Sequence, residues 1–166
     1  LAGYEGLVAL PCYRWTHVLV LPPAHPLLNE TAPITLAQLA QHPIITYDLG
    51  FTGRSHIDTA FARAGVRPDI VLTAMDADVI KTYVELELGV GIIAAIAFDP
   101  ERDRQLRTLD ARHLFETNTT RLGLRRDAWL RGYGYEFIEL FVPTLTRALV
   151  EQALRSEGPD AWGDHI

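Results

Sequence analysis

The chain has 166 residues, of which 48% are hydrophobic and 22% are charged, and its formal net charge is −6. This composition is typical of one globular domain or of two small lobes, and it excludes an intrinsically disordered chain. The scattered basic residues form no stripe, so the sequence by itself is not expected to bind nucleic acid. Its apolar runs are far shorter than the roughly 20 residues that a membrane-spanning helix needs.

The start of the chain predicts no secretory leader, because it carries no basic segment and reaches Pro11 early. The single cysteine, Cys12, cannot form an internal disulfide, and we interpret it as a small buried hydrophobic residue rather than as a reactive thiol. Both features favour a cytoplasmic setting. The first residue is not Met, so we expect a fragment or a processed product.

Short β-like runs alternate with amphipathic stretches along the chain, which predicts an α/β fold. Strands or buried strand-like segments are expected at Val18–Leu21, Ile44–Tyr47, Ile70–Thr73, Ile92–Ile93 and Arg121–Leu124. Helices are expected at Thr35–Gln41, at Ser55–Ala64, from Asp76 to the stop at Gly89, and from about Tyr133 to Arg155 with a bend at Pro143. Thr35, Ser55 and Asp76 are the expected N-caps, and Gly65 is the expected C-terminal stop of the second helix.

Two segments are expected to cross between lobes: Pro11–Trp15, and the polar, non-periodic stretch Phe98–Asn118. Two crossings predict a bilobal architecture with one complete lobe between them. We therefore assign residues 1–14 to the end of the first lobe and the first crossing, and 15–115 to the second lobe. Residues 116–155 return to the first lobe and its C-terminal helix, and 156–166 form a frayed tail.

Signatures of catalysis, metal binding and cofactor binding are absent. The sequence contains no GxSxG, HExxH, P-loop or GxGxxG motif. Gly89-Val90-Gly91 is similar to the start of a dinucleotide-binding turn, but it lacks the third glycine and follows a helix instead of a strand. No two of the six histidines lie at metal-ligand spacing with a cysteine or carboxylate. The sequence therefore predicts no enzyme, no metal and no cofactor.

The most informative segment is 46–55, where a strand ends, a glycine-containing turn follows and a helix begins. Ligands of open α/β sheets bind outside the carboxyl ends of the strands, and a helix N-terminus presents free amides to an anion. Gly50 and Gly53 allow close backbone approach, Thr52 adds a hydroxyl and Arg54 adds charge. The segment thus predicts a site for a small carboxylate, phosphate or sulfate, although a capped turn without ligand would show the same spacing.

Two further positions are candidates, and the second, Thr73, lies on the same rim as Thr52 if the sheet is parallel. Trp15 lies at the first crossing, where a packed hinge aromatic is the simpler interpretation. Thr73 precedes the turn to the next helix and is placed to form the floor of the same cleft, while Asp76 is expected to cap that helix. The complete set of candidate ligand-binding residues is Thr52, Gly53, Arg54, Trp15, Ser55, Thr46 and Thr73.

Several motifs resemble the effector-binding domain of CysB-type LysR transcriptional regulators. The resemblance runs to about Arg155, and FTGRS joined to DADVIKTYV is its most specific part. The motifs are LPCYRW (Leu10–Trp15), AHPL (Ala24–Leu27), FTGRS (Phe51–Ser55), DADVIKTYV (Asp76–Val84), LGVGIIA (Leu88–Ala94) and TTRLGLRR (Thr119–Arg126).

The resemblance implies a two-lobed fold similar to type 2 periplasmic binding proteins, with the effector in the cleft between the lobes. It implies control of sulfur assimilation and cysteine synthesis through acetylserine, sulfate, thiosulfate, adenylyl sulfate or an organosulfonate. Promoter DNA would be bound by a separate N-terminal helix-turn-helix in a homotetramer, with this domain forming dimers. The family's anion-site threonine and tryptophan correspond to Thr52 and Trp15.

One departure from the family concerns the first lobe. Its opening strand and threonine-rich turn, TTHTQ-like in the family, have no counterpart here, so we expect a half-built site, weak ligand binding and exposed apolar surface. A transporter's solute receptor would share the fold and remains the alternative function. An α/β enzyme, deaminase-like or a transferase, would need a converging acid, base or nucleophile set, and none is found.

Overall fold

The computed structural model describes residues 6–156. The chain divides into two compact units, unit 1 (Leu1–Arg14 with Thr119–Ile166) and unit 2 (Trp15–Asn118). In chain order the elements are β1 (Leu7–Trp15), β2 (His17–Leu21), the 3₁₀ turn Pro26–Asn29, α1 (Leu36–Leu39), β3 (Pro43–Tyr47), α2 (Thr52–Ala64), β4 (Asp69–Ala74), α3 (Ala77–Glu85), β5 (Val90–Ala94), the 3₁₀ turn Ala95–Ala97, β6 (Arg107–Asp110), β7 (Asn118–Arg125), α4 (Gly132–Phe141) and α5 (Arg147–Arg155).

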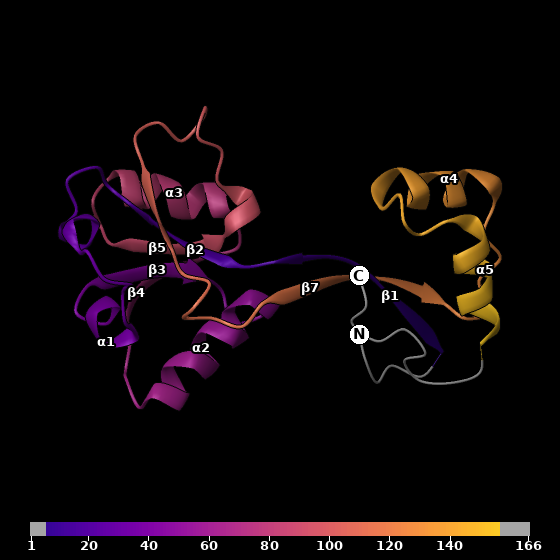
Figure 1. Ribbon diagram of the computed structural model, residues 1–166, viewed down its shortest axis with the longest axis horizontal. Helices are drawn as coiled ribbons and strands as arrows, with labels where there is room; N and C mark the ends of the chain where they lie inside the picture. The colour runs from indigo at the N-terminus through magenta and orange to yellow at the C-terminus, as the bar shows by residue number, and fades with distance from the viewer. Residues whose placement is uncertain (1–5, 157–166) are drawn as a thin grey trace. The chain divides into compact units, whose positions relative to one another are not determined.

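Unit 2 is built on a five-stranded mixed sheet in the order β4-β3-β5-β2-β6. β3 runs parallel to β4 and β5, whereas β2 runs antiparallel to β5 and β6. Helices α1 and α2 cover one face of this sheet and α3 covers the other (Figure 1). The two apolar clusters beneath them are centred on Phe61 and on Ile80. The expected α/β fold is confirmed.

The three parallel strands bring their carboxyl ends to one edge of the sheet, and α2 and α3 both begin there. α3 starts with the expected cap, since a carboxylate oxygen of Asp76 accepts the amide of Asp78 at 2.6 Å. α1 starts with a capping box in which Thr35 and Gln38 bond each other's backbone amides. α2 ends at Gly65, whose φ of 65° is the left-handed C-terminal stop that the sequence predicts.

Glycines in the β5 motif permit close packing. A Cβ on Gly91 would lie 2.3 Å from a methyl of Val20 and 2.9 Å from a methyl of Val84. A Cβ on Gly89 would lie 2.6 Å from the carbonyl oxygen of Pro43. The Gly-Val-Gly run is therefore explained by the approach of β5 to its neighbours.

A buried ion pair fastens α3 to the segment after β5. Lys81 Nζ lies 3.1 Å from the carboxylate of Asp103 and donates to the carbonyl of Ala97 at 3.0 Å. The same carboxylate accepts the amide of Asp99 at 2.8 Å. Both charged side chains are nearly buried, so their mutual pairing is what makes their burial tolerable.

Unit 1 consists of the paired strands β1 and β7 with α4 and α5 (Figure 1). Cys12 lies in its apolar cluster beside Ile138, and burial raises the pKa of its thiol. The expectation of a packed hydrophobic cysteine fits this position. α4 exposes the side chains of Tyr133, Phe137, Leu140 and Phe141, which we call the α4 aromatic face.

Four sequence expectations about the elements are wrong. Ser55 is not a cap, because α2 already begins at Thr52. α3 ends at Glu85 rather than at Gly89, and Glu87 takes the left-handed conformation with φ of 60° in the turn that follows. Pro143 separates two helices instead of bending one, because Val142 before it is extended.

The fourth concerns Phe98–Asn118, which is more than a crossing. It contains β6, which pairs with β2 at the edge of the sheet. Strand β1 was likewise unforeseen along most of its length. Of the expected tail 156–166, residues 157–166 lie outside the described residues.

Candidate functional site

The first turn of α2 has no side-chain cap. Its N-cap, Phe51, has an extended backbone and offers no acceptor, in contrast to the capped starts of α1 and α3. The amide of Arg54 turns back to the carbonyl of Phe51 at 3.0 Å, but the amides of Thr52 and Gly53 have no partner among the described residues. A 13-residue helix thus presents two free N–H groups and the positive end of its dipole.

Thr52 is exposed at this turn, and its hydroxyl is in none of the hydrogen bonds of residues 6–156. The Thr52 carbonyl accepts a hydrogen bond from the hydroxyl of Ser55 at 2.7 Å, so the Ser55 hydroxyl is engaged within the helix. A free hydroxyl next to two free amides is a donor set that suits an anionic oxygen.

Arg54 does not face solvent as a free charge. Its side chain is buried, donating to the carbonyl of Tyr47 at 2.9 Å and pairing with Asp58 at 2.8 Å. The guanidinium therefore ties the first turn of α2 to the end of β3. Arg54 would therefore support a bound anion by holding the first turn in place, and not by binding the anion directly.

Gly53 packs against two aromatic rings. A Cβ at this position would lie 3.0 Å from Trp15 Cη2 and 3.1 Å from His17 Nε2. The backbone is helical here, so glycine is required by space and not by its dihedral angles. Trp15 thus supports the free amides from behind, as a wall residue of the predicted site would.

His17 is a part of this arrangement that sequence reasoning missed. It is 1% exposed and packs edge-on against Trp15 and Phe115, with ring centroids 5.2 and 5.3 Å away. Burial lowers the pKa of His17 to about 4, helped by nearby His56 and partly opposed by the backbone of Gly53. The alternation of His17 with Leu19 and Leu21 on one face of β2 was the available signal.

The two remaining candidates lie on the strands. Thr46 is fully buried in β3 and donates its hydroxyl to the carbonyl of Ile92 at 3.1 Å, so this hydroxyl serves the sheet. Thr73 is exposed on β4 and is the register partner of Thr46. The structure thus brings Thr52, Gly53 and Trp15 together, whereas Thr46 is engaged elsewhere.

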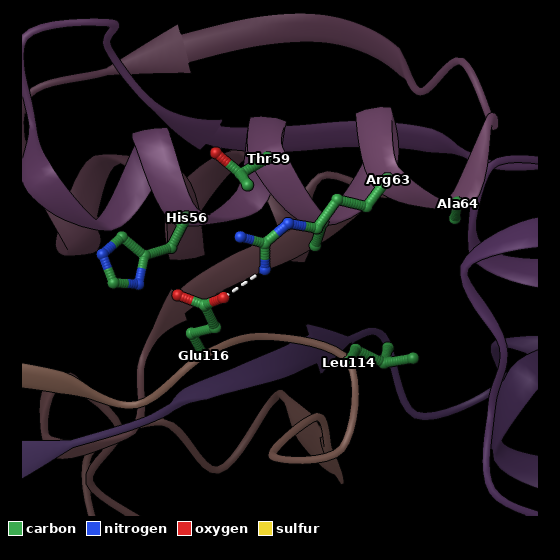
Figure 2. Close-up of a pocket in the computed structure, with 7 residues that line it drawn as sticks. His56, Thr59, Arg63, Ala64, Leu114 and Glu116 are labelled. Carbon is green, nitrogen blue, oxygen red and sulfur yellow. Dashed lines mark hydrogen bonds and ion pairs between the residues drawn. The ribbon is translucent and has the colours of Figure 1, made fainter.

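A separate pocket of about 280 Å³ lies along α2, beyond its first turn (Figure 2). His56, Thr59 and Arg63 of α2 form one wall, and Leu114 and Glu116 form the other. Arg63 and Glu116 form an ion pair that joins the two walls. Because these charges neutralise each other, this pocket is a poorer anion site than the free amides of the first turn.

Within residues 6–156 no group of three His, Cys, Asp or Glu side chains is arranged to hold a metal ion. The same residues include no helix long and apolar enough to cross a membrane. The first turn of α2 offers amides, a hydroxyl and a helix dipole to an anion.

The chain is similar to known proteins along nearly all of its length. Residues 3–158 match the LysR substrate binding domain family. The chain is 58% identical over 157 residues to the transcriptional regulator CysB of Burkholderia cenocepacia, covering 95% of this chain and 50% of that protein. It is 56% identical over 152 residues to the regulator SsuR of the same organism, covering 92% of this chain and 49% of that protein.

A solved structure of the cofactor-binding domain of the Cbl transcriptional regulator superposes with a TM-score of 0.85 at 46% identity. It covers 93% of this chain and 68% of that one. The chain spans about half the length of the curated relatives described above, which are regulators and not enzymes. The family match over nearly all of the sequence, together with the Cbl-like fold, shows that the chain belongs to the LysR substrate-binding domain family.

Proposed function

We propose that this chain is the effector-sensing domain of a LysR-type regulator of sulfur assimilation or cysteine synthesis. In this proposal the first turn of α2 binds a small anion, which is an acetylserine, sulfate or a related sulfur compound. The observation that carries it is the pair of unpartnered amides at Thr52 and Gly53, backed by Trp15. The similarity to CysB, SsuR and Cbl supports the sulfur assignment.

The mechanism is a shift of population. An effector that binds one conformation of the domain more tightly favours that conformation by no more than its difference in affinity. A coupling of about 1–3 kcal/mol between effector and promoter binding is ordinary for such proteins. DNA binding would belong to a helix-turn-helix elsewhere in a longer, homo-oligomeric protein that works in the cytoplasm. The regulatory names of the relatives favour this function over a transporter's solute receptor.

Calorimetric titration with sulfate, thiosulfate, O-acetylserine and N-acetylserine tests the proposal. Thr52→Ala should weaken binding by about 10- to 150-fold, because a hydrogen bond to a charged group contributes roughly 1.5–3 kcal/mol. Thr59→Ala is the matched control, since it makes the same change on the exposed surface of α2, farther from the first turn. Equal affinities for both variants would refute the site. The titration extends to millimolar ligand, where even the expected weak site would be occupied, and no binding there by the folded wild-type chain would refute the sulfur-effector function.

A further inference from the structure

Two histidines next to the first turn of α2 have ring nitrogens that are buried and unpaired. Among the described residues no hydrogen bond of normal geometry reaches Nδ1 or Nε2 of His17, although the backbone of Gly53 lies close enough to favour the imidazolium. Nδ1 of His56 also lacks a partner. The great majority of buried polar side-chain atoms in folded proteins do have a partner. An unsatisfied imidazole that is 1% exposed is therefore a feature that calls for a functional explanation.

The position of His17 links it to the proposed anion site. Its Nε2 lies 3.1 Å from the point where a Gly53 Cβ would stand, so the imidazole packs against the glycine that carries one of the two free first-turn amides. The unpaired, almost fully buried imidazole is a second observation beside the uncapped helix start, and it comes from a different strand. The two converge on one place in unit 2.

The surroundings of His17 hold little charge. From α2, the titratable neighbour is His56, while the guanidinium of Arg54 is turned to Tyr47 and Asp58. From β5, the register partner is Ala94. From β6, Asp110 is the register partner of the neighbouring Val18, and its carboxylate pairs with Arg112. β1 contributes the ring of Trp15, and the segment after β6 contributes the ring of Phe115. Two charged or titratable residues lie near Phe115 in the sequence and are engaged elsewhere: His113 contacts the carbonyl of Ile34, and Glu116 pairs with Arg63. No carboxylate in this set is directed at His17, so an added anion would be the main influence on its charge.

We propose that His17 makes anion binding at this site proton-linked: an anion held at the first turn of α2 draws a proton from solvent onto the imidazole, so that anion and proton bind together. This inference rests on the proposed function, and it adds a residue and a mode of regulation to the same site. Without an anion, burial and the nearby His56 keep His17 neutral. With an anion in place, the imidazolium gains an opposite charge across one glycine backbone.

The linkage has a defined direction. The anion-bound site holds a proton at a higher pH than the free site does, so affinity must rise as the pH falls through this interval. If the bound anion makes the imidazole about a hundredfold more basic, affinity increases roughly tenfold between about pH 7 and about pH 5. Sulfate is the suitable probe, because its own charge does not change in this range.

The test is isothermal titration of the 166-residue chain with sulfate at several pH values, each in two buffers of different ionisation enthalpy. The wild-type chain should bind more tightly at the lower pH, and the buffer difference should reveal proton uptake. His17→Gln should bind sulfate with nearly the same affinity at every pH and take up no proton. His56→Gln is the matched control and should keep both effects.

Three outcomes would overturn the inference. pH-independent sulfate binding by the wild type would refute the linkage and leave the proposed function intact. If His56→Gln loses the pH dependence and His17→Gln keeps it, the proton binds His56, and the inference about His17 is refuted. Absence of sulfate binding at every pH, with none of the acetylserines or thiosulfate bound either, would refute the proposed function and the inference with it. Circular dichroism of each variant shows whether a lost signal reflects unfolding.

Discussion

Replacing Gly53 with alanine tests whether the first turn of α2 is positioned by its contact with Trp15 and His17. The added methyl would stand 3.0 Å from Trp15 Cη2 and 3.1 Å from His17 Nε2, so the two rings or the turn must shift by a few tenths of an ångström. Two effects on the free energy of unfolding oppose each other. Alanine favours a helical backbone over glycine by about 0.5–1 kcal/mol, whereas overpacking of a tight contact costs about 1–3 kcal/mol.

The steric effect is the larger, so Gly53→Ala should lower the free energy of unfolding by about 1–2 kcal/mol. In a domain of this size that corresponds to a fall in Tm of about 2–8 °C. Sulfate affinity should fall by more than stability suggests, about tenfold, because displaced amides lose well-aligned hydrogen bonds to the anion. A thermal melt followed by circular dichroism measures the first effect, and calorimetric titration measures the second.

Gly50→Ala is the matched control, because nothing lies within 4 Å of the Cβ it would add in the same loop. This variant should melt and bind sulfate much like the wild-type chain. The reasoning fails if Gly53→Ala is as stable as wild type and binds sulfate equally well. It also fails if both variants lose the same affinity, since the loss would then come from loop flexibility and not from the aromatic contact.

Three other expectations concern stability. Gly91→Ala should destabilise unit 2 by about 3 kcal/mol or more in a urea titration, because its methyl would overlap Val20 in the core. Gly134→Ala is the control: its methyl meets only ordinary contacts in α4, so the same titration should find it neutral or stabilising. Lys81→Met should lower the free energy of unfolding by about 3–5 kcal/mol, because it leaves Asp103 buried without its cation. Adding Asp103→Leu should recover a large part of this loss. No recovery in the double variant would show that the unpaired charge was not the cause. Burial holds the pKa of His17 at about 4 in the folded chain, below its ordinary value of 6.5. As the pH falls below about 6.5, the unfolded chain therefore binds more protons than the folded chain, and the free energy of unfolding should fall by about 3 kcal/mol by about pH 4. Melts between about pH 7 and about pH 4.5 should show a flatter pH dependence for His17→Gln, and an equal slope in both proteins would contradict the assignment.

The sequence predicted most of the fold of unit 2, because its elements carry strong local signals. The strand at Ile44–Tyr47 and the caps at Thr35 and Asp76 are each determined by residues next to one another in the chain, and the structure places them as expected. β6 was missed because only one of its residues is even partly buried. Its strand conformation comes from pairing with β2, which no local pattern reports.

The local geometry of the candidate site was predicted in part for the same reason. Thr52 and Gly53 belong to a recognisable strand–turn–helix pattern, and the structure leaves their amides free as that pattern suggests. The fate of Arg54 and Thr46 depended on partners that come into reach only in the folded chain, the carbonyls of Tyr47 and Ile92. His17 was overlooked because a single histidine among apolar residues has the same local appearance whether it is packed, exposed or functional.

The α4 aromatic face has a practical consequence for every stability experiment on this chain. Tyr133, Phe137 and Leu140 are 69%, 63% and 84% exposed on one side of α4. Fluorescent dyes that report unfolding do so by binding exposed apolar surface, which is also the property used to diagnose molten globules. The native chain should therefore bind such a dye before any heating, and a strong initial signal would be a property of the folded molecule. Near-ultraviolet circular dichroism, which depends on fixed aromatic packing, distinguishes this native surface from a loosened core.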